Sequence, residues 1–159
     1  MMTDPERTQK IKKIEQLPSQ TEQAVRHLND EQLDTPYRAG GWTVRQVIHH
    51  LADSHMNAFI RTKLIVTEEN PTLKTYEQEE WARTADGSAT SVEGSLAILK
   101  GLHHRWVHLL NSLGPEAWKR TAMHPENGLM TLDDIVTLYA RHGENHVSQI
   151  TGLRKERGW

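Results

Sequence analysis

Apolar residues recur every three to four positions in four long stretches of the chain, the spacing that places them on one face of an α-helix. The first stretch covers residues 5–29, the second 43–66, the third about 90–113 and the fourth 131–156. Pro18 lies inside the first stretch and predicts a kink there or two shorter helices. No stretch alternates apolar and polar residues as a strand does, so the pattern predicts an all-α protein.

Helix start and stop signals agree with these stretches. A capping box, with Thr followed three residues later by an acid or amide, begins the last three: Thr43 with Gln46, Thr90 with Glu93, and Thr131 with Asp134. Residues 113–115, Leu-Gly-Pro, end the third. The connection 67–89 is long enough for a crossover and for a short helix near residues 77–83. These features predict a single-domain four-helix bundle, residues 1–159, with one long crossover.

Composition excludes several classes of protein. The 159 residues include 19 Lys and Arg against 21 Asp and Glu, so no overall field favours nucleic acid or an anionic membrane. The absence of Cys excludes thiol nucleophiles, Cys-ligated zinc and disulfides. No apolar run approaches the roughly 18 residues of a membrane span, and residues 1–10 lack the apolar part of a secretory signal, so we expect a cytoplasmic protein. Ten His against one Phe direct the search for function to histidine.

Two histidines fall near the centre of the apolar stripe of the fourth helix. His142 and His146 are four residues apart, so their rings lie one turn above the other. Two imidazoles so placed can share a metal ion, as in H-E-x-x-H zinc sites; the alternative is a pair of surface histidines. Glu144 follows the first histidine by two residues and projects to the opposite face, so the general base of that motif is absent.

A catalytic zinc takes three ligands from the protein and keeps a position for water, so a third ligand is needed. Periodicity favours His55 of the second helix, near the middle of its apolar stripe, and then His103 of the third. The alternative for each is a core histidine hydrogen-bonded to a facing polar group. His50 lies at the edge of the stripe. Three more histidines fall on polar faces and are expected to be solvated: His49, His104 and His108.

Residues 33–57, LDTPYRAGGWTVRQVIHHLADSHMN, resemble the start and second helix of the DinB/YfiT-like superfamily, and most closely its YfiT branch of metal-dependent hydrolases. The resemblance continues through residues 102–106, Leu-His-x-Arg-Trp, through His124-Pro125, and through the pair His142 and His146. It therefore covers nearly the whole chain.

The resemblance implies a four-helix bundle, commonly dimeric, that holds one divalent metal ion on three histidines, with zinc as the expected ion and nickel as the alternative. The family's ligand on the second helix is the His immediately before a Leu, which here is His50, and the ligands on the last helix match His142 and His146. This assignment displaces His55, which is then expected, with His103, behind the ligands or in packing. YfiT-branch proteins usually begin with a Tyr-Pro-rich segment that this sequence lacks; if that segment roofs the pocket, we expect the substrate side to differ.

Three functions follow from such a site. A metal-dependent hydrolase acting on a small molecule is expected first. A hydrolase of this kind usually needs a general base, but the spacing of the chain places no carboxylate beside the metal. Four acidic residues are candidates for that base: Asp53, Glu68, Glu69 and Glu126. The second function is an S-transferase that uses a low-molecular-weight thiol such as bacillithiol or mycothiol, as some relatives do, since a metal-bound thiol ionises without a protein base. The third is a non-catalytic metal-binding stress protein.

Overall fold

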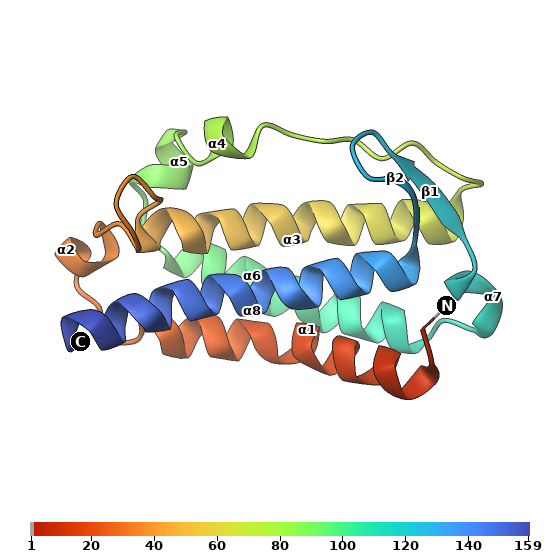
Figure 1. Ribbon diagram of the computed structural model, residues 1–159, viewed down its shortest axis with the longest axis horizontal. Coiled ribbons are helices and arrows are strands. Elements are labelled where there is room, and N and C mark those ends of the chain that lie inside the picture. Colours follow the sequence, from red (N-terminus) through yellow and green to blue (C-terminus); the bar gives the residue numbers. More distant parts are fainter. Residues whose placement is uncertain (1) are drawn as a thin grey trace.

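The computed structural model describes residues 2–159 and contains four long helices packed as a bundle (Figure 1). These are α1 (Asp4–Val25), α3 (Val44–Thr67), α6 (Glu93–Asn111) and α8 (Leu132–Arg157). Single-turn helices lie in the connections: α2 (Asp30–Leu33), α4 (Gln78–Trp81), α5 (Ala85–Ser88) and α7 (Pro115–Trp118). None of the helices in this described part has the length and apolar character to cross a membrane. The predicted four-helix bundle is confirmed.

The helices do not follow a simple up-and-down order. The α1 and α8 helices run in one direction and α3 and α6 in the other (Figure 1). Both α1 and α3 pack against α6 and α8, so these two consecutive long helices lie at diagonal corners of the bundle. The connection between α3 and α6 returns along the length of the bundle, as Figure 1 shows, which is the predicted crossover, and it carries α4 and α5. This order places the middle of α8 beside α3.

Two of the three predicted capping boxes begin helices. Thr43 caps α3 and Thr131 caps α8, and each side-chain oxygen accepts the N–H three residues later. The third prediction is wrong, because α6 begins three residues after Thr90, with Val92 as an N-cap that makes no side-chain hydrogen bond. The carbonyl of Thr90 instead accepts a hydrogen bond from the buried guanidinium of Arg45, 3.1 Å away, which ties that residue into the loop.

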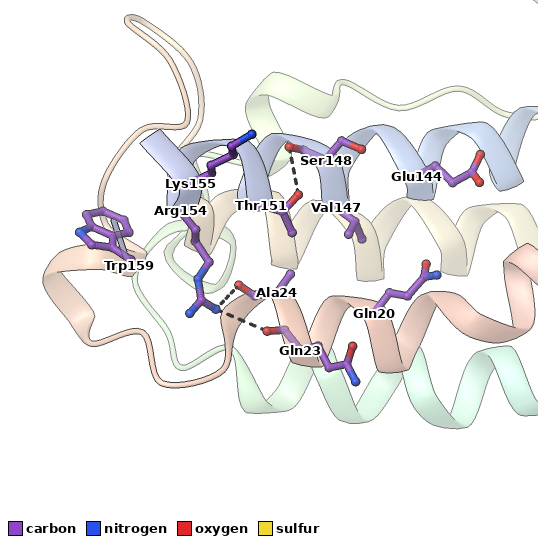
Figure 2. A pocket seen from close by; sticks show the side chains of 10 residues that line it. All are labelled: Gln20, Gln23, Ala24, Glu144, Val147, Ser148, Thr151, Arg154, Lys155 and Trp159. Atoms are coloured by element: carbon purple, nitrogen blue, oxygen red, sulfur yellow. Dashed lines mark hydrogen bonds between the residues drawn. The ribbon is translucent and has the colours of Figure 1, made fainter. Parts of the chain in front are cut away.

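The first helix differs from its prediction at two points. Pro18 lies inside an unbroken α1, so the predicted division into two helices is not found. The helix also ends at Val25 rather than near residue 29, and the chain turns at His27, whose φ is +66°. Arg154 of α8 donates to the carbonyls of Gln23 and Ala24 in the last turn of α1, where the backbone carbonyls run out of helical N–H donors (Figure 2). These bonds lie in a hollow of about 830 Å³ between α1 and α8 that none of the histidines lines.

A two-stranded hairpin lies before α8, where no strand was predicted. Strand β1 (Thr121–His124) pairs antiparallel with β2 (Gly128–Thr131). Four residues a strand are too few for an alternating pattern to stand out, but Asn127-Gly128 is the turn signal of a hairpin, and Gly128 has a φ of +72°. Met123 of β1 also bonds through its backbone to Pro71 and Leu73. These bonds attach the start of the connection between α3 and α6 to the hairpin.

Gly143 lets α8 pack closely against α1 beside His142. A Cβ atom at residue 143 would lie 2.6 and 2.8 Å from the methyl carbons of Leu17, whose side chain is 2% exposed. At Gly152, exposed on the same helix, a Cβ atom would meet nothing within 4 Å. Both Gly→Ala changes gain about 1 kcal/mol of helix propensity, but overpacking at residue 143 costs about 1–3 kcal/mol. We therefore expect Gly143→Ala to be less stable than Gly152→Ala by about 1–3 kcal/mol in urea unfolding; equal stabilities would contradict this packing.

Candidate metal centre

Helices α3 and α8 bring three imidazoles to one point. His50 lies in the second turn of α3, and His142 and His146 lie on successive turns of α8. Nε2 of His142 is 3.1 Å from Nε2 of His50 and 3.2 Å from Nε2 of His146. The three rings offer ligand atoms that all lie within 4.8 Å of one another, and no acidic side chain of residues 2–159 belongs to the group.

This arrangement fits a divalent ion. A zinc ion binds imidazole nitrogen at about 2.0–2.1 Å, so two tetrahedral nitrogen ligands are roughly 3.3 Å apart. The separations of 3.1 and 3.2 Å between the Nε2 atoms are close to that value. Imidazole nitrogen is a donor that zinc and nickel both accept. Three protein nitrogens also leave room for a further ligand in the coordination shell.

Burial keeps these imidazoles uncharged. Burial, reinforced by the two neighbouring histidines, lowers the pKa of His50 to about 2. Burial, together with His146, lowers the pKa of His142 to about 3. Burial also lowers the pKa of His146, and the hydrogen bond to Gln149 opposes this effect. All three rings are therefore neutral at pH 7, which is the protonation state that binds a metal.

The second nitrogen of His146 and the outer side of the cluster have partners that sequence reasoning missed. Nδ1 of His146 lies 2.8 Å from Oε1 of Gln149, so it donates to an amide oxygen and leaves Nε2 with its lone pair. The sequence signal for this contact was the spacing of His146 and Gln149, which lie three residues apart on one helix and are therefore neighbours on its surface. Trp42 packs against His50 at 4.6 Å between ring centroids and stacks on His146 at 6.5 Å. Its indole N–H donates to Glu79, which ties the ring to the crossover connection.

The other candidate histidines lie outside the cluster. His55 and His103 are fully buried, and His55 touches the cluster only through Nδ1 of His142, 3.2 Å from its own Nε2. The choice of His55 as a ligand from periodicity alone is therefore not supported by this geometry. His104 and His108 are exposed as predicted. The prediction for His49 is wrong, because its ring is buried and bonds to Ser95 and the Thr90 carbonyl.

No carboxylate lies beside the cluster in the described chain. Glu144 points away and pairs with Lys13 at 2.7 Å, as its predicted position on the opposite face implies. Glu68, Glu69 and Glu126 are exposed. Asp53 is half-buried, and burial, together with Asp86, raises its pKa to about 6. Its carboxylate is not part of the histidine group.

Known proteins of similar sequence carry a consistent description. A protein from Bacillus cereus (strain 03BB102) named "Putative metal-dependent hydrolase" is 52% identical over 149 residues, which cover 94% of this chain and 86% of that protein. A relative from Oceanobacillus iheyensis with the same description is 51% identical over the same coverage. The structure of YfiT from Bacillus subtilis, described as a probable metal-dependent hydrolase with an unusual four-helix bundle topology, matches with a TM-score of 0.97 and 43% identity. The match covers 100% of this chain and 91% of that one.

The family assignment rests on most of the chain. A model of the DinB superfamily matches residues 13–150, a range that includes the three clustered histidines. The resemblance seen in residues 33–57 is thereby confirmed, and the YfiT structure confirms its branch. This chain belongs to the DinB superfamily.

Proposed function

We propose that this chain is a single-domain metal-dependent hydrolase with one divalent ion held by His50, His142 and His146. The observation that carries the proposal is the convergence of three neutral imidazole Nε2 atoms at separations of 3.1 and 3.2 Å between neighbours. The descriptions of the Bacillus cereus relative and of YfiT support the same activity. Zinc is the expected ion and nickel the alternative, since both bind imidazole.

The chain's own residues prepare the site for this chemistry. When bound, the ion supplies Lewis-acid chemistry, since it acidifies water and polarises a carbonyl or phosphoryl oxygen. Burial holds the three rings neutral, so the protein adds no charge that would offset that of the ion. Trp42 covers one side of the cluster and limits how a small molecule approaches it. No catalytic residue other than the ligands is assigned.

The missing carboxylate favours one second candidate, a metal-dependent S-transferase that uses a low-molecular-weight thiol such as bacillithiol or mycothiol. Such a reaction needs no protein general base, because a metal ion promotes ionisation of a thiol directly. The histidine group contains no Asp or Glu, and the chain contains no Cys. A non-catalytic metal-binding stress protein is the third candidate.

A homodimer and a cytoplasmic location stay predictions. Light scattering on the purified protein tests whether it is a dimer.

Two assays on purified protein separate these candidates. The zinc-loaded protein is assayed with small ester and amide substrates, and turnover without thiol that is lost in His142→Ala supports the hydrolase. The cobalt-substituted protein is titrated with a small thiol, and a new thiolate charge-transfer band together with thiol-dependent turnover supports the transferase. Metal binding with neither activity leaves the stress protein, and failure to bind zinc, nickel or cobalt contradicts the proposed centre.

A further inference from the structure

A line of imidazoles continues from the histidine cluster through the interior of the bundle. Nδ1 of His142 lies 3.2 Å from Nε2 of His55, and Nδ1 of His55 lies 3.0 Å from Nε2 of His103. Nδ1 of His103 lies 2.6 Å from the carbonyl oxygen of Ile14. The line therefore passes from α8 through α3 and α6 to α1, and each of the four long helices contributes one group.

Pro18 makes the last acceptor of this line available. It lies four residues after Ile14 within α1, and a proline has no N–H to donate to the carbonyl four residues before it. The proline ring also crowds that carbonyl. The Ile14 carbonyl thus cannot receive the ordinary helix bond from residue 18, and His103 supplies a donor in its place. The same proline that predicted a break leaves the helix unbroken and frees one acceptor in the core.

A carbonyl oxygen can only accept, so it assigns the proton on every ring of the line. His103 carries its proton on Nδ1 and presents the lone pair of Nε2 to His55. His55 then carries its proton on Nδ1 and presents Nε2 to His142. His142 in turn donates from Nδ1, and its Nε2 faces the cluster with a lone pair. His55 and His103 are 0% and 1% exposed and bond to no acid, so each ring is neutral and carries one proton.

We propose that the Ile14 carbonyl, freed by Pro18, sets the tautomers of His103, His55 and His142 in series, so that His142 is held ready to bind the metal through Nε2. This inference rests on the proposed metal centre and makes His55 and His103 positioning residues. Partners of the second nitrogen of a metal-binding histidine typically contribute about 10–100-fold to metal affinity. Here the partner is another imidazole, which can donate or accept, so it needs its own fixed acceptor to keep one tautomer.

Nitrogen-15 NMR of the metal-free protein with labelled histidine tests the tautomers directly. We expect the three rings of the line to carry hydrogen on Nδ1 and a lone pair on Nε2. A His142 ring with its hydrogen on Nε2 would overturn the inference. This measurement needs no metal and no variant, so it decides the tautomer question even if the wild-type protein proves not to bind zinc, a result that would instead contradict the proposed function.

The His103→Leu variant tests the consequence for binding. Without its acceptor, His55 can place its proton on Nε2, which forces the proton of His142 onto the nitrogen that must bind the metal. We expect zinc affinity, measured by competition with a chelator, to fall about 10–100-fold, and the NMR spectrum of His142 to show both tautomers. The matched control His49→Leu removes another buried, carbonyl-bonded imidazole outside the line and should leave zinc affinity unchanged. Wild-type affinity in His103→Leu would overturn the inference.

The Pro18→Ala variant separates this mechanism from general damage to the fold. Alanine restores an N–H that competes for the Ile14 carbonyl, and it also removes a residue unfavourable inside a helix. We expect the protein to become more stable toward urea while its zinc affinity falls, by less than in His103→Leu because a carbonyl has two lone pairs. Unchanged or higher zinc affinity in the more stable variant would show that Pro18 has no part in the line.

Discussion

Replacing His142 with alanine is expected to weaken zinc binding on the order of a hundredfold to a thousandfold. Four-ligand structural zinc sites bind with about 10–16 kcal/mol, so each ligand accounts for roughly 2.5–4 kcal/mol. His142 is the middle of the three rings, with Nε2 atoms of the other two at 3.1 and 3.2 Å, so its loss leaves two ligands on different helices. Competition with a chelator of known affinity measures the change.

The lower zinc affinity of His142→Ala should also reduce the amount by which zinc stabilises the folded protein. At free zinc a thousand times its dissociation constant, binding stabilises the wild-type fold by about 4 kcal/mol. A variant weakened a thousandfold gains only about 0.4 kcal/mol under those conditions. His104→Ala, an exposed imidazole outside the cluster, is the control and should keep the full gain. An undiminished zinc response in His142→Ala would show that the ion binds elsewhere.

The helix pattern predicted the bundle because each long helix buries a broad apolar face. The errors occur where a short-range signal competes with a tertiary contact. At Thr90 the capping pattern is present, but the Thr90 carbonyl accepts a hydrogen bond from the buried Arg45, and α6 begins three residues later. At Pro18 the lost backbone bond is offset by packing along the rest of α1, so no break forms. The hairpin of β1 and β2 was missed because its strands have four residues each.

For the candidate site, spacing alone identified the pair on α8 but not the third member. Helical projection reports which face a residue occupies, and it placed His55 nearer the middle of the buried face than His50. It does not report how far along α3 the neighbouring α8 lies, and that offset decides which histidine reaches the cluster. The resemblance to the DinB family supplied the choice of His50. His49 shows the same limit, since its polar face is buried by Ser95 and by the loop at Thr90.

The buried imidazoles also predict how the metal-free protein responds to acid. Burial lowers the pKa of His103 to about 4 and that of His142 to about 3, and it lowers the pKa of His55 well below its usual value. In the unfolded chain these groups return to about 6.5. Below pH 6.5 the unfolded state therefore binds protons that the folded state does not, and the free energy of unfolding falls as pH falls. The loss ends for each ring when pH passes its folded pKa.

This dependence of the free energy of unfolding on pH is expected to be steep. Each such imidazole costs about 1.4 kcal/mol per pH unit between its two pKa values, so these three rings together with His50, whose pKa burial lowers to about 2, give roughly 5–6 kcal/mol per unit. A typical free energy of unfolding of about 5–15 kcal/mol is then lost within a few pH units. We therefore expect the metal-free protein to unfold cooperatively between pH 6 and 4. Urea unfolding at stepped pH measures the slope. The His103→Leu variant should lose up to about 1.4 kcal/mol per unit of that slope, whereas His104→Gln, exposed to water in both states, should keep it. A stability that stays level down to pH 4 would contradict the burial of these rings as neutral groups.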